Sequence, residues 1–348
     1  MLAVVSISRR PAFRSVKLDS HSPDTPRALF RDLPRDPDVK FLWAHQDRVL
    51  EAYEGLTRAQ DLALELPTGT GKTLIGLLIA EWRRRHKHER ALYVCPTRQL
   101  AHQVGAQAAR YGISAKVCLT PDYDGLSLWQ GGDAVAISTY SALFNYNPKF
   151  TAPQTLILDD AHAADGYVAD HWTVTIDRDK LSAVYHQLVA LLSPLLGAHT
   201  IGVLTSPTAP GSTDRTAVEL LPLPMWWKYA DEIRNILDGA LTGNDQWYAW
   251  NDTIKNGLPA CNLLVSWQEI TLRPLAPTTE LHPEFAGAAQ RVYMSATLGA
   301  GGELERIFGV RSIQRVPVPE EWEQRSTGRR LFLLPAASLG STDLPPKP

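Results

Sequence analysis

The chain has 348 residues, of which 44% are hydrophobic and 21% charged, and its formal net charge is −2. This composition is typical of a globular protein that is large enough for two domains, or for one domain with a large insertion. The near-neutral charge excludes a protein that holds nucleic acid by bulk positive charge, so any such binding must use a local groove.

The cysteines and the N-terminal residues indicate a cellular compartment. Cys95, Cys118 and Cys261 are too widely spaced for a disulfide framework or a four-thiolate metal site, which favours a reducing environment. Residues 1–13 do not resemble a signal peptide, because the arginines follow the apolar stretch. Since no run approaches the ~18 apolar residues of a membrane helix, we expect a cytoplasmic protein without a membrane partner.

Residues 1–73 predict a lead-in, a helix, a strand and a glycine-rich turn. Residues 1–38 are rich in proline, aspartate and arginine, and an amphipathic helix is expected from residue 41. A short strand at 61–66 runs into PTGTGKT and then into an apolar helix. This order of strand, glycine-rich turn and helix is the context that a phosphate-binding loop requires.

The strand pattern continues and predicts a parallel sheet with helices on both faces. Apolar strands are expected at 91–97, 114–120, 133–140 and 154–160, with a helix at 98–112, and the pattern resumes at 291–298. Residues 163–290 interrupt it with a long helix candidate at 181–196, proline-rich turns and six of the ten tryptophans. We expect this segment to be a mainly helical insertion, with tryptophans that pack in a core of its own rather than stack on bases.

These changes in pattern give five expected segments. They are a lead-in at 1–38, a lobe that contains the glycine-rich turn at 39–162, the insertion at 163–290, the return of the lobe at 291–320, and a linker at 321–348.

Residues 66–73 match the phosphate-loop pattern G-x-x-x-x-G-K-[ST] except that Leu66 stands at the first glycine. The glycines let backbone N–H groups turn inward around a phosphate, Lys72 meets the β- and γ-phosphates, and Thr73 offers a hydroxyl to Mg²⁺. The alternative is a glycine turn with a surface lysine. The nucleotide-binding residues expected here are Thr68, Gly69, Thr70, Gly71, Lys72 and Thr73.

Asp159 and Asp160 follow the apolar run LIL at the end of a predicted strand. Such a strand end lies at the same sheet edge as the phosphate loop, where Asp159 could hold Mg²⁺ and Asp160 could orient the attacking water. The alternative for an Asp-Asp pair is a solvated loop.

Five short segments now occur in the order of the motifs of a known family. PTGTGKT, PTRQLAHQ (96–103), STYSAL (138–143), DDAH (159–162) and SAT (295–297) resemble motifs I, Ia, Ib, II and III of superfamily 2 helicases and translocases of the DEAD/DEAH-box kind. The resemblance covers 41–162 and 291–298 and implies a RecA-like motor lobe, with ATP and Mg²⁺ as cofactors. Nucleic acid is the implied partner, with DNA favoured and RNA possible.

The resemblance also implies a role for individual residues. Gln46 would contact the adenine, and His162 would join Lys72, Asp159 and Asp160 in the catalytic set. Ser295 and Thr297 would couple the nucleotide site to the nucleic acid through hydrogen bonds with motif II. The residues that would line the nucleic-acid track are Pro96, Thr97, Arg98 and Thr139.

The basic run at 83–90 has two readings. Positive charges at the C-terminal end of a helix complement its dipole and are usually solvated, which is the reading we favour. A nucleic-acid patch is the alternative.

The sequence departs from the family between motifs II and III and after motif III. The insertion at 163–290 resembles the arch domain of the XPD/DinG-like branch, which acts on DNA, but the chain lacks the four cysteines of that branch's iron–sulfur cluster. Residues after 298 are too few for the family's second lobe of ~150 residues. We therefore expect a second lobe in cis beyond the chain end or in trans, and no cluster.

The residues QRSTGR at 324–329 have one residue too many for the family's arginine-finger motif. Because such a finger contributes ~10³–10⁵ to phosphoryl-transfer rates, hydrolysis by this chain alone should be slow.

The expected function is the ATP-binding lobe of a nucleic-acid-dependent ATPase, a helicase or translocase that couples ATP hydrolysis to movement on DNA or to its unwinding. One alternative is a non-hydrolysing module that binds nucleotide or nucleic acid and docks a partner. A small-molecule kinase is another, but it leaves PTRQLA and SAT unexplained.

Overall fold

The computed structural model describes residues 23–67, 69–296 and 301–317. Thr68, Thr297, the first 22 residues of the lead-in, the linker at 321–348 and its QRSTGR segment lie outside the described residues.

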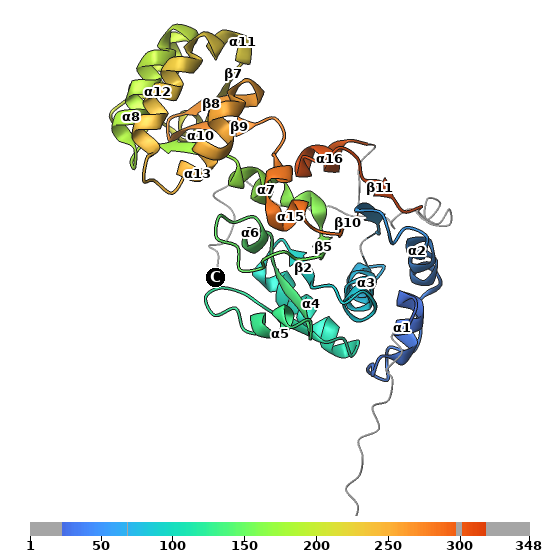
Figure 1. Ribbon diagram of the computed structural model, residues 1–348. Coiled ribbons are helices and arrows are strands. Elements are labelled where there is room, and N and C mark those ends of the chain that lie inside the picture. The colour runs from blue at the N-terminus through green and yellow to red at the C-terminus, as the bar shows by residue number, and fades with distance from the viewer. Residues whose placement is uncertain (1–22, 68, 297–300, 318–348) are drawn as a thin grey trace, which may run out of the picture.

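A seven-stranded parallel sheet forms the main lobe, in the order β11-β1-β10-β5-β2-β4-β3, which confirms the predicted fold (Figure 1). Strands β2, β4, β5 and β10 are buried along their whole length, as expected for a parallel sheet that is covered on both faces. The strands are β1 Asp61–Glu65, β2 Ala91–Cys95, β3 Ala115–Val117, β4 Val135–Thr139, β5 Thr155–Asp159, β10 Gln290–Ser295 and β11 Gln314–Arg315.

Two separate clusters of apolar side chains cover the two faces of this sheet. Alternate residues of a strand enter opposite clusters, because successive side chains point to opposite faces: Ile157 packs in one, and Leu156 and Leu158 pack in the other. The first face carries α1 Pro26–Asp32, α2 Ala44–Glu54, α3 Lys72–His86 and α4 Arg98–Arg110. The second carries α5 Leu126–Gln130, α6 Tyr140–Leu143, α7 Asp165–His171, α15 Pro283–Ala286 and α16 Glu303–Phe308.

The basic run at the end of α3 is largely built into the fold. Arg83 is buried, at 3% exposure, and donates to the carboxylate of Glu89 at 2.7 Å. Arg84 and Arg85 both pair with Glu81, which has no exposed side-chain surface. The expectation of solvated charges is therefore wrong for Arg83, because the ion pair with Glu89 and a hydrogen bond to the Thr155 hydroxyl of β5 compensate its burial.

The insertion is organised around a second, four-stranded antiparallel sheet in the order β6-β9-β8-β7. Its strands are β6 Val174–Asp177, β7 Val218–Leu221, β8 Cys261–Ser266 and β9 Glu269–Pro274. Its helices are α8 Ser182–Leu192, α9 Ala198–Thr205, α10 Ser212–Thr216, α11 Leu223–Trp226, α12 Ala230–Leu241, α13 Trp247–Ala249 and α14 Lys255–Gly257.

The expectation of a mainly helical insertion missed this sheet. Its strands have only four to six residues, and the β8–β9 hairpin turns within the two residues Trp267 and Gln268. The alternation of buried Cys261, Leu263 and Val265 along β8 is the period-two signal that could have revealed it.

The insertion has its own apolar core, and Figure 1 shows it projecting from the lobe beside α7. Trp226 and Trp250 are fully buried in this core, consistent with packing rather than base stacking. Trp172 and Phe285 instead pack in the core of the main lobe, so α7 and α15 lie with the lobe. Among residues 23–67, 69–296 and 301–317, no helix has the length and apolar character needed to cross a bilayer.

Candidate active site

The carboxyl ends of the parallel strands bring the predicted motifs to one edge of the sheet. In the strand register Glu65 pairs with Ser295 and Met294 pairs with Asp159, so the segments after β1, β5 and β10 are neighbours. The segments after β2 and β4 continue the same edge. In open parallel sheets, ligands bind outside these carboxyl ends.

The phosphate loop has the backbone that its sequence predicts. Gly69 and Gly71 have φ values of 84° and 81°, a left-handed conformation that glycine adopts without strain. Helix α3 begins at Lys72, directly after Gly71, so its N-terminal N–H groups and positive dipole end face the loop. Leu66 is accommodated where the pattern has glycine: its side chain is buried and its N–H donates to the Ser295 carbonyl at 2.8 Å.

Gln46 and His45 of α2 hold the phosphate loop from outside. Gln46 is buried, and its Nε2 donates to the Thr70 carbonyl at 3.0 Å while its Oε1 accepts from the Trp43 N–H at 3.0 Å. A Cβ on Gly71 would lie 2.2 Å from Gln46 Nε2, so any other residue would displace this amide as well as strain the left-handed backbone. Nε2 of His45 lies 2.9 Å from the same Thr70 carbonyl. The base contact of Gln46 stays a prediction, and this clamp on the loop is an additional contact that the sequence did not reveal.

A pocket of about 450 Å³ opens beside Gln46 and the loop glycines. Phe41 and Trp43 line it and are 69% and 50% exposed, and Arg110 and Tyr111 border it as well. Exposed aromatic faces next to a phosphate loop suit a planar base. Sequence reasoning missed these residues, although two aromatic side chains directly before a helix were a visible signal.

Asp159 is held at both carboxylate oxygens. It is 5% exposed, its Oδ1 accepts the Asp160 N–H at 3.0 Å, and its Oδ2 accepts the Tyr93 hydroxyl at 2.9 Å. Burial raises the pKa of Asp159, while the Tyr93 hydrogen bond and the charge of Lys72 act in the opposite direction. Thr73 follows Lys72 at the start of α3, directly after the phosphate loop, and so lies at the same sheet edge as this carboxylate. A carboxylate and a hydroxyl are oxygen donors of the kind that Mg²⁺ prefers, and the pair therefore fits this ion.

Asp160 is exposed and adopts a left-handed backbone, with φ of 50°. Aspartate tolerates this conformation better than most residues. Its carbonyl accepts the Ala163 N–H at 2.8 Å, which begins the short helical turn Ala161–Ala164. The role of Asp160 in orienting water remains a prediction.

His162 joins the segment after β5 to the segment after β10. Its Nδ1 lies 2.7 Å from the Ser295 Oγ, and its Nε2 lies 3.7 Å from a carboxylate oxygen of Glu303 in α16. The predicted partners His162 and Ser295 are thus in contact, and Glu303 is a neighbour that the sequence did not indicate.

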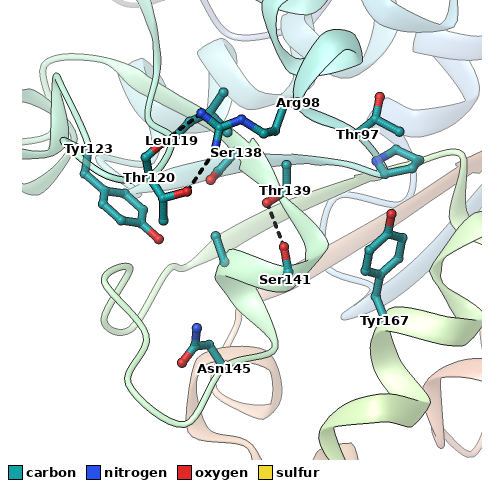
Figure 2. Close-up of a pocket in the computed structure, with 12 residues that line it drawn as sticks. Thr97, Arg98, Leu119, Thr120, Tyr123, Ser138, Thr139, Ser141, Asn145 and Tyr167 are labelled. Carbon is teal, nitrogen blue, oxygen red and sulfur yellow. Dashed lines mark hydrogen bonds between the residues drawn. The ribbon is translucent and has the colours of Figure 1, made fainter.

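The four predicted track residues line one pocket of about 380 Å³ (Figure 2). The Arg98 guanidinium donates to both the hydroxyl and the carbonyl of Thr120, each at 2.8 Å. Thr97 accepts the Leu100 N–H at 3.2 Å and caps α4, and the hydroxyls of Thr139 and Ser141 are 3.1 Å apart.

Arg98 is the one charged side chain among the described residues that line this pocket. Hydroxyls, the amide of Asn145 and the rings of Tyr123 and Tyr167 supply the remaining polar and aromatic surface (Figure 2). The pocket therefore offers hydrogen bonds and one guanidinium rather than a dense positive field.

A model of the DEAD/DEAH box helicase family matches residues 43–194. This part of the chain is therefore similar to a DEAD/DEAH box helicase domain. The match contains the phosphate loop, the PTR segment and DDAH, and it confirms the predicted superfamily 2 motor lobe.

Three solved structures resemble the chain at low identity. An XPD helicase is 15% identical with a TM-score of 0.46, and the match covers 82% of this chain and 64% of that one. An apo XPD is 15% identical with a TM-score of 0.45, and the match covers 80% of this chain and 59% of that one. Xpd4 of S. tokodaii is 16% identical with a TM-score of 0.39, and the match covers 73% of this chain and 57% of that one. The chain spans less than two thirds of the length of each of them.

The main lobe thus brings Lys72, Asp159 and His162 to one sheet edge, with the track pocket further along that edge. Thr68 and Thr297 lie outside the described residues. The tyrosine at position 93 was missed because it lies inside a buried apolar strand, where an aromatic residue usually serves packing alone.

Proposed function

We propose that this chain is the ATP-binding lobe of a nucleic-acid-dependent ATPase that acts as a helicase or translocase. One observation carries the proposal: the phosphate loop after β1 and the buried Asp159 after β5 share a sheet edge within a segment similar to a DEAD/DEAH box helicase domain. The reaction is in-line attack of water on the γ-phosphate of ATP.

Each side chain of the site has a distinct part in this proposal. Lys72 and the N-terminal N–H groups of α3 bind the β- and γ-phosphates, and Phe41, Trp43 and Gln46 surround the base. Thr73 and Asp159 are the groups that would hold Mg²⁺, which when bound neutralises charge on the phosphates. Asp160 orients the water.

The short side chain of Asp160 bears on the expected rate of ATP hydrolysis. The DEAD/DEAH family normally has glutamate at this position, and aspartate is one methylene shorter, about 1.5 Å. Misplacement of a reacting group by ~1 Å can cost ~10²-fold in rate. We therefore expect slow hydrolysis unless a bridging water restores the geometry.

The track pocket supports nucleic acid as the partner. Its four predicted residues lie after β2 and β4, on the sheet edge that also carries the phosphate loop. The hydroxyls and Arg98 suit contacts to a phosphate backbone, and the two tyrosines suit stacking on unpaired bases. DNA is favoured over RNA by the position of the insertion between motifs II and III.

A second RecA-like lobe belongs to the proposed assembly. The described residues contain one parallel sheet, and the attacking water and the γ-phosphate need stabilising charge from the opposite side. This lobe would be supplied in cis or in trans.

The shorter Asp160 also favours one alternative, a module that binds ATP or nucleic acid without hydrolysis and docks a partner through its insertion. Nucleotide binding without turnover would distinguish it from a motor lobe.

ATP turnover is the test of the proposed function. We would measure it for the chain with Mg²⁺, alone and mixed with a candidate second lobe, in the presence of single-stranded DNA or RNA of equal length. The proposal predicts slow turnover that nucleic acid and the second lobe accelerate, more with DNA. Turnover no higher than that of Lys72→Ala in every mixture would overturn it.

A further inference from the structure

A buried phenol lies against the carboxylate of Asp159, one of the groups that would hold Mg²⁺. Tyr93 is in the middle of β2 and has no exposed surface. Its hydroxyl donates to Asp159 Oδ2 at 2.9 Å. One side chain from a neighbouring strand thus touches the motif II carboxylate from within the sheet.

This contact fixes the orientation of the Asp159 carboxylate. The Asp160 N–H already engages Oδ1 at 3.0 Å, so the Tyr93 hydroxyl supplies the second donor, on the other oxygen. A carboxylate with a donor on each oxygen cannot rotate about its Cβ–Cγ bond without losing one of them. It has about four lone-pair sites, so acceptor positions remain for a cation.

Core packing alone does not require this hydroxyl. The neighbouring residues Leu92 and Val94 are apolar and fully buried, and a phenylalanine ring at position 93 would fill the same volume. The hydroxyl is tolerated because it has a partner, and this partner is a carboxylate oxygen of the proposed metal site.

We propose that Tyr93 is a positioning residue that holds the Asp159 carboxylate in the orientation that binds Mg²⁺ with ATP. The inference rests on the ATP–Mg²⁺ site of the proposed function and extends it to a residue of the buried sheet. Outer-shell partners of ligating carboxylates typically contribute 10–100-fold to metal affinity or activity.

The test is the Mg²⁺ requirement of ATP binding in Tyr93→Phe, which removes only the hydroxyl. ATP affinity is measured at increasing Mg²⁺ concentration and separately in excess EDTA. We expect the Mg²⁺ concentration that gives half of the increase in ATP affinity to be about 10–100-fold higher in the variant. The ATP affinity in excess EDTA should be unchanged. A purely structural role would change both alike or neither.

Tyr293→Phe is the matched control. Tyr293 is also fully buried, and its hydroxyl donates to a carboxylate oxygen of Asp61 at 2.6 Å, but Asp61 begins β1 and so lies at the opposite sheet edge. This variant loses the same chemical group at equal burial and should keep the parental Mg²⁺ requirement. An equal shift in both variants would overturn the inference, because general loss of stability would then explain it.

A double-variant cycle adds a second criterion. If Tyr93 acts through the Asp159 carboxylate, adding Tyr93→Phe to Asp159→Asn should change the Mg²⁺ requirement little further. If ATP binding by the parent depends on Mg²⁺ and Tyr93→Phe shows the same dependence, this inference alone is overturned. Parental binding with no response to Mg²⁺, or no ATP binding, overturns the proposed function together with it.

Discussion

The Nδ1 atom of His162 lies 2.7 Å from the Oγ atom of Ser295, although the whole insertion separates these residues in sequence. The contact is possible because β5 and β10 are adjacent in the sheet, so the insertion leaves and re-enters the lobe between neighbouring strands. The histidine also approaches Glu303 of α16, which ties the segment after β10 to motif II.

The first prediction concerns this contact. Ser295→Ala removes the hydroxyl, so ATP affinity should persist while stimulation of ATPase by nucleic acid falls. Residues that couple two sites typically contribute about 0.5–2 kcal/mol to the coupling free energy, so we expect the stimulation by nucleic acid to fall by roughly 2- to 30-fold. Turnover of the two-lobe assembly with and without single-stranded DNA measures it.

Ser114→Ala is the control for that measurement, because the Ser114 hydroxyl donates to the Asp133 carbonyl at the start of β3, away from the nucleotide site. Equal stimulation in Ser295→Ala and the parent would contradict a coupling role for Ser295.

The second prediction concerns Asp160. Asp160→Asn keeps the side-chain length but removes the charge, and should lower turnover by ~10²–10⁴-fold if the carboxylate acts on the water. Asp160→Glu should match or exceed the parent, because it restores the longer side chain. ATP binding should be the same in all three proteins. Turnover like the parent's in both variants would remove Asp160 from the catalytic set.

The third prediction concerns the track pocket. Arg98→Ala should weaken binding of single-stranded DNA by a similar factor for all sequences, because a guanidinium at this position contacts phosphate. The slope of log K against log salt should decrease by about 0.7. Arg58→Ala, an exposed arginine between α2 and β1, is the control that removes the same charge. An unchanged slope in Arg98→Ala would exclude a phosphate contact.

The fourth prediction concerns pH and the junction beside the insertion. The ring of His171 stacks on Tyr146 at 4.1 Å, and burial, aided by the neighbouring His282, lowers the pKa of His171 to about 4. In the unfolded chain a histidine has a pKa of about 6.5, so the unfolded state binds the extra proton between these values. The contribution of His171 to the free energy of unfolding should be constant above about pH 6.5. It should decrease as the pH drops toward 4, by up to about 1.4 kcal/mol per pH unit.

Chemical denaturation of the parent and of His171→Phe between pH 7 and pH 5 measures this effect. The variant keeps an aromatic ring and should lose less stability on acidification, although burial also lowers the pKa of His282, which remains. His199→Gln, at an exposed histidine of α9, should behave like the parent. An identical pH dependence in His171→Phe would show that His171 does not titrate in this range.

The main lobe could be predicted from the sequence because each of its central strands is a short apolar run that ends in a recognisable motif. Ile157 between Leu156 and Leu158 shows the reason: both faces of β5 are buried, so the run is continuous. The insertion sheet could not be predicted as easily, since β7 and β8 pair in space while more than thirty intervening residues form helices.

Single contacts within the site were the least predictable part. His45 and Gln46 are consecutive polar residues of a helix, and nothing in their spacing indicates that both reach the Thr70 carbonyl. Tyr93 resembles a core residue in sequence, and only the approach of β5 gives its hydroxyl a partner. Such contacts depend on tertiary packing, which local sequence patterns do not encode.

The measurement that tests the account most directly is the titration of ATP–Mg²⁺ into the parent and into Lys72→Ala. Lys72 begins α3 next to the left-handed Gly71, where its ammonium would meet the phosphates. Loss of a charged hydrogen bond of about 1.5–3 kcal/mol predicts an affinity at least roughly tenfold weaker in the variant. Lys87→Ala, at the other end of the same helix, should bind like the parent. Equal affinities for the parent and Lys72→Ala would contradict the phosphate-loop assignment and, with it, the proposed function.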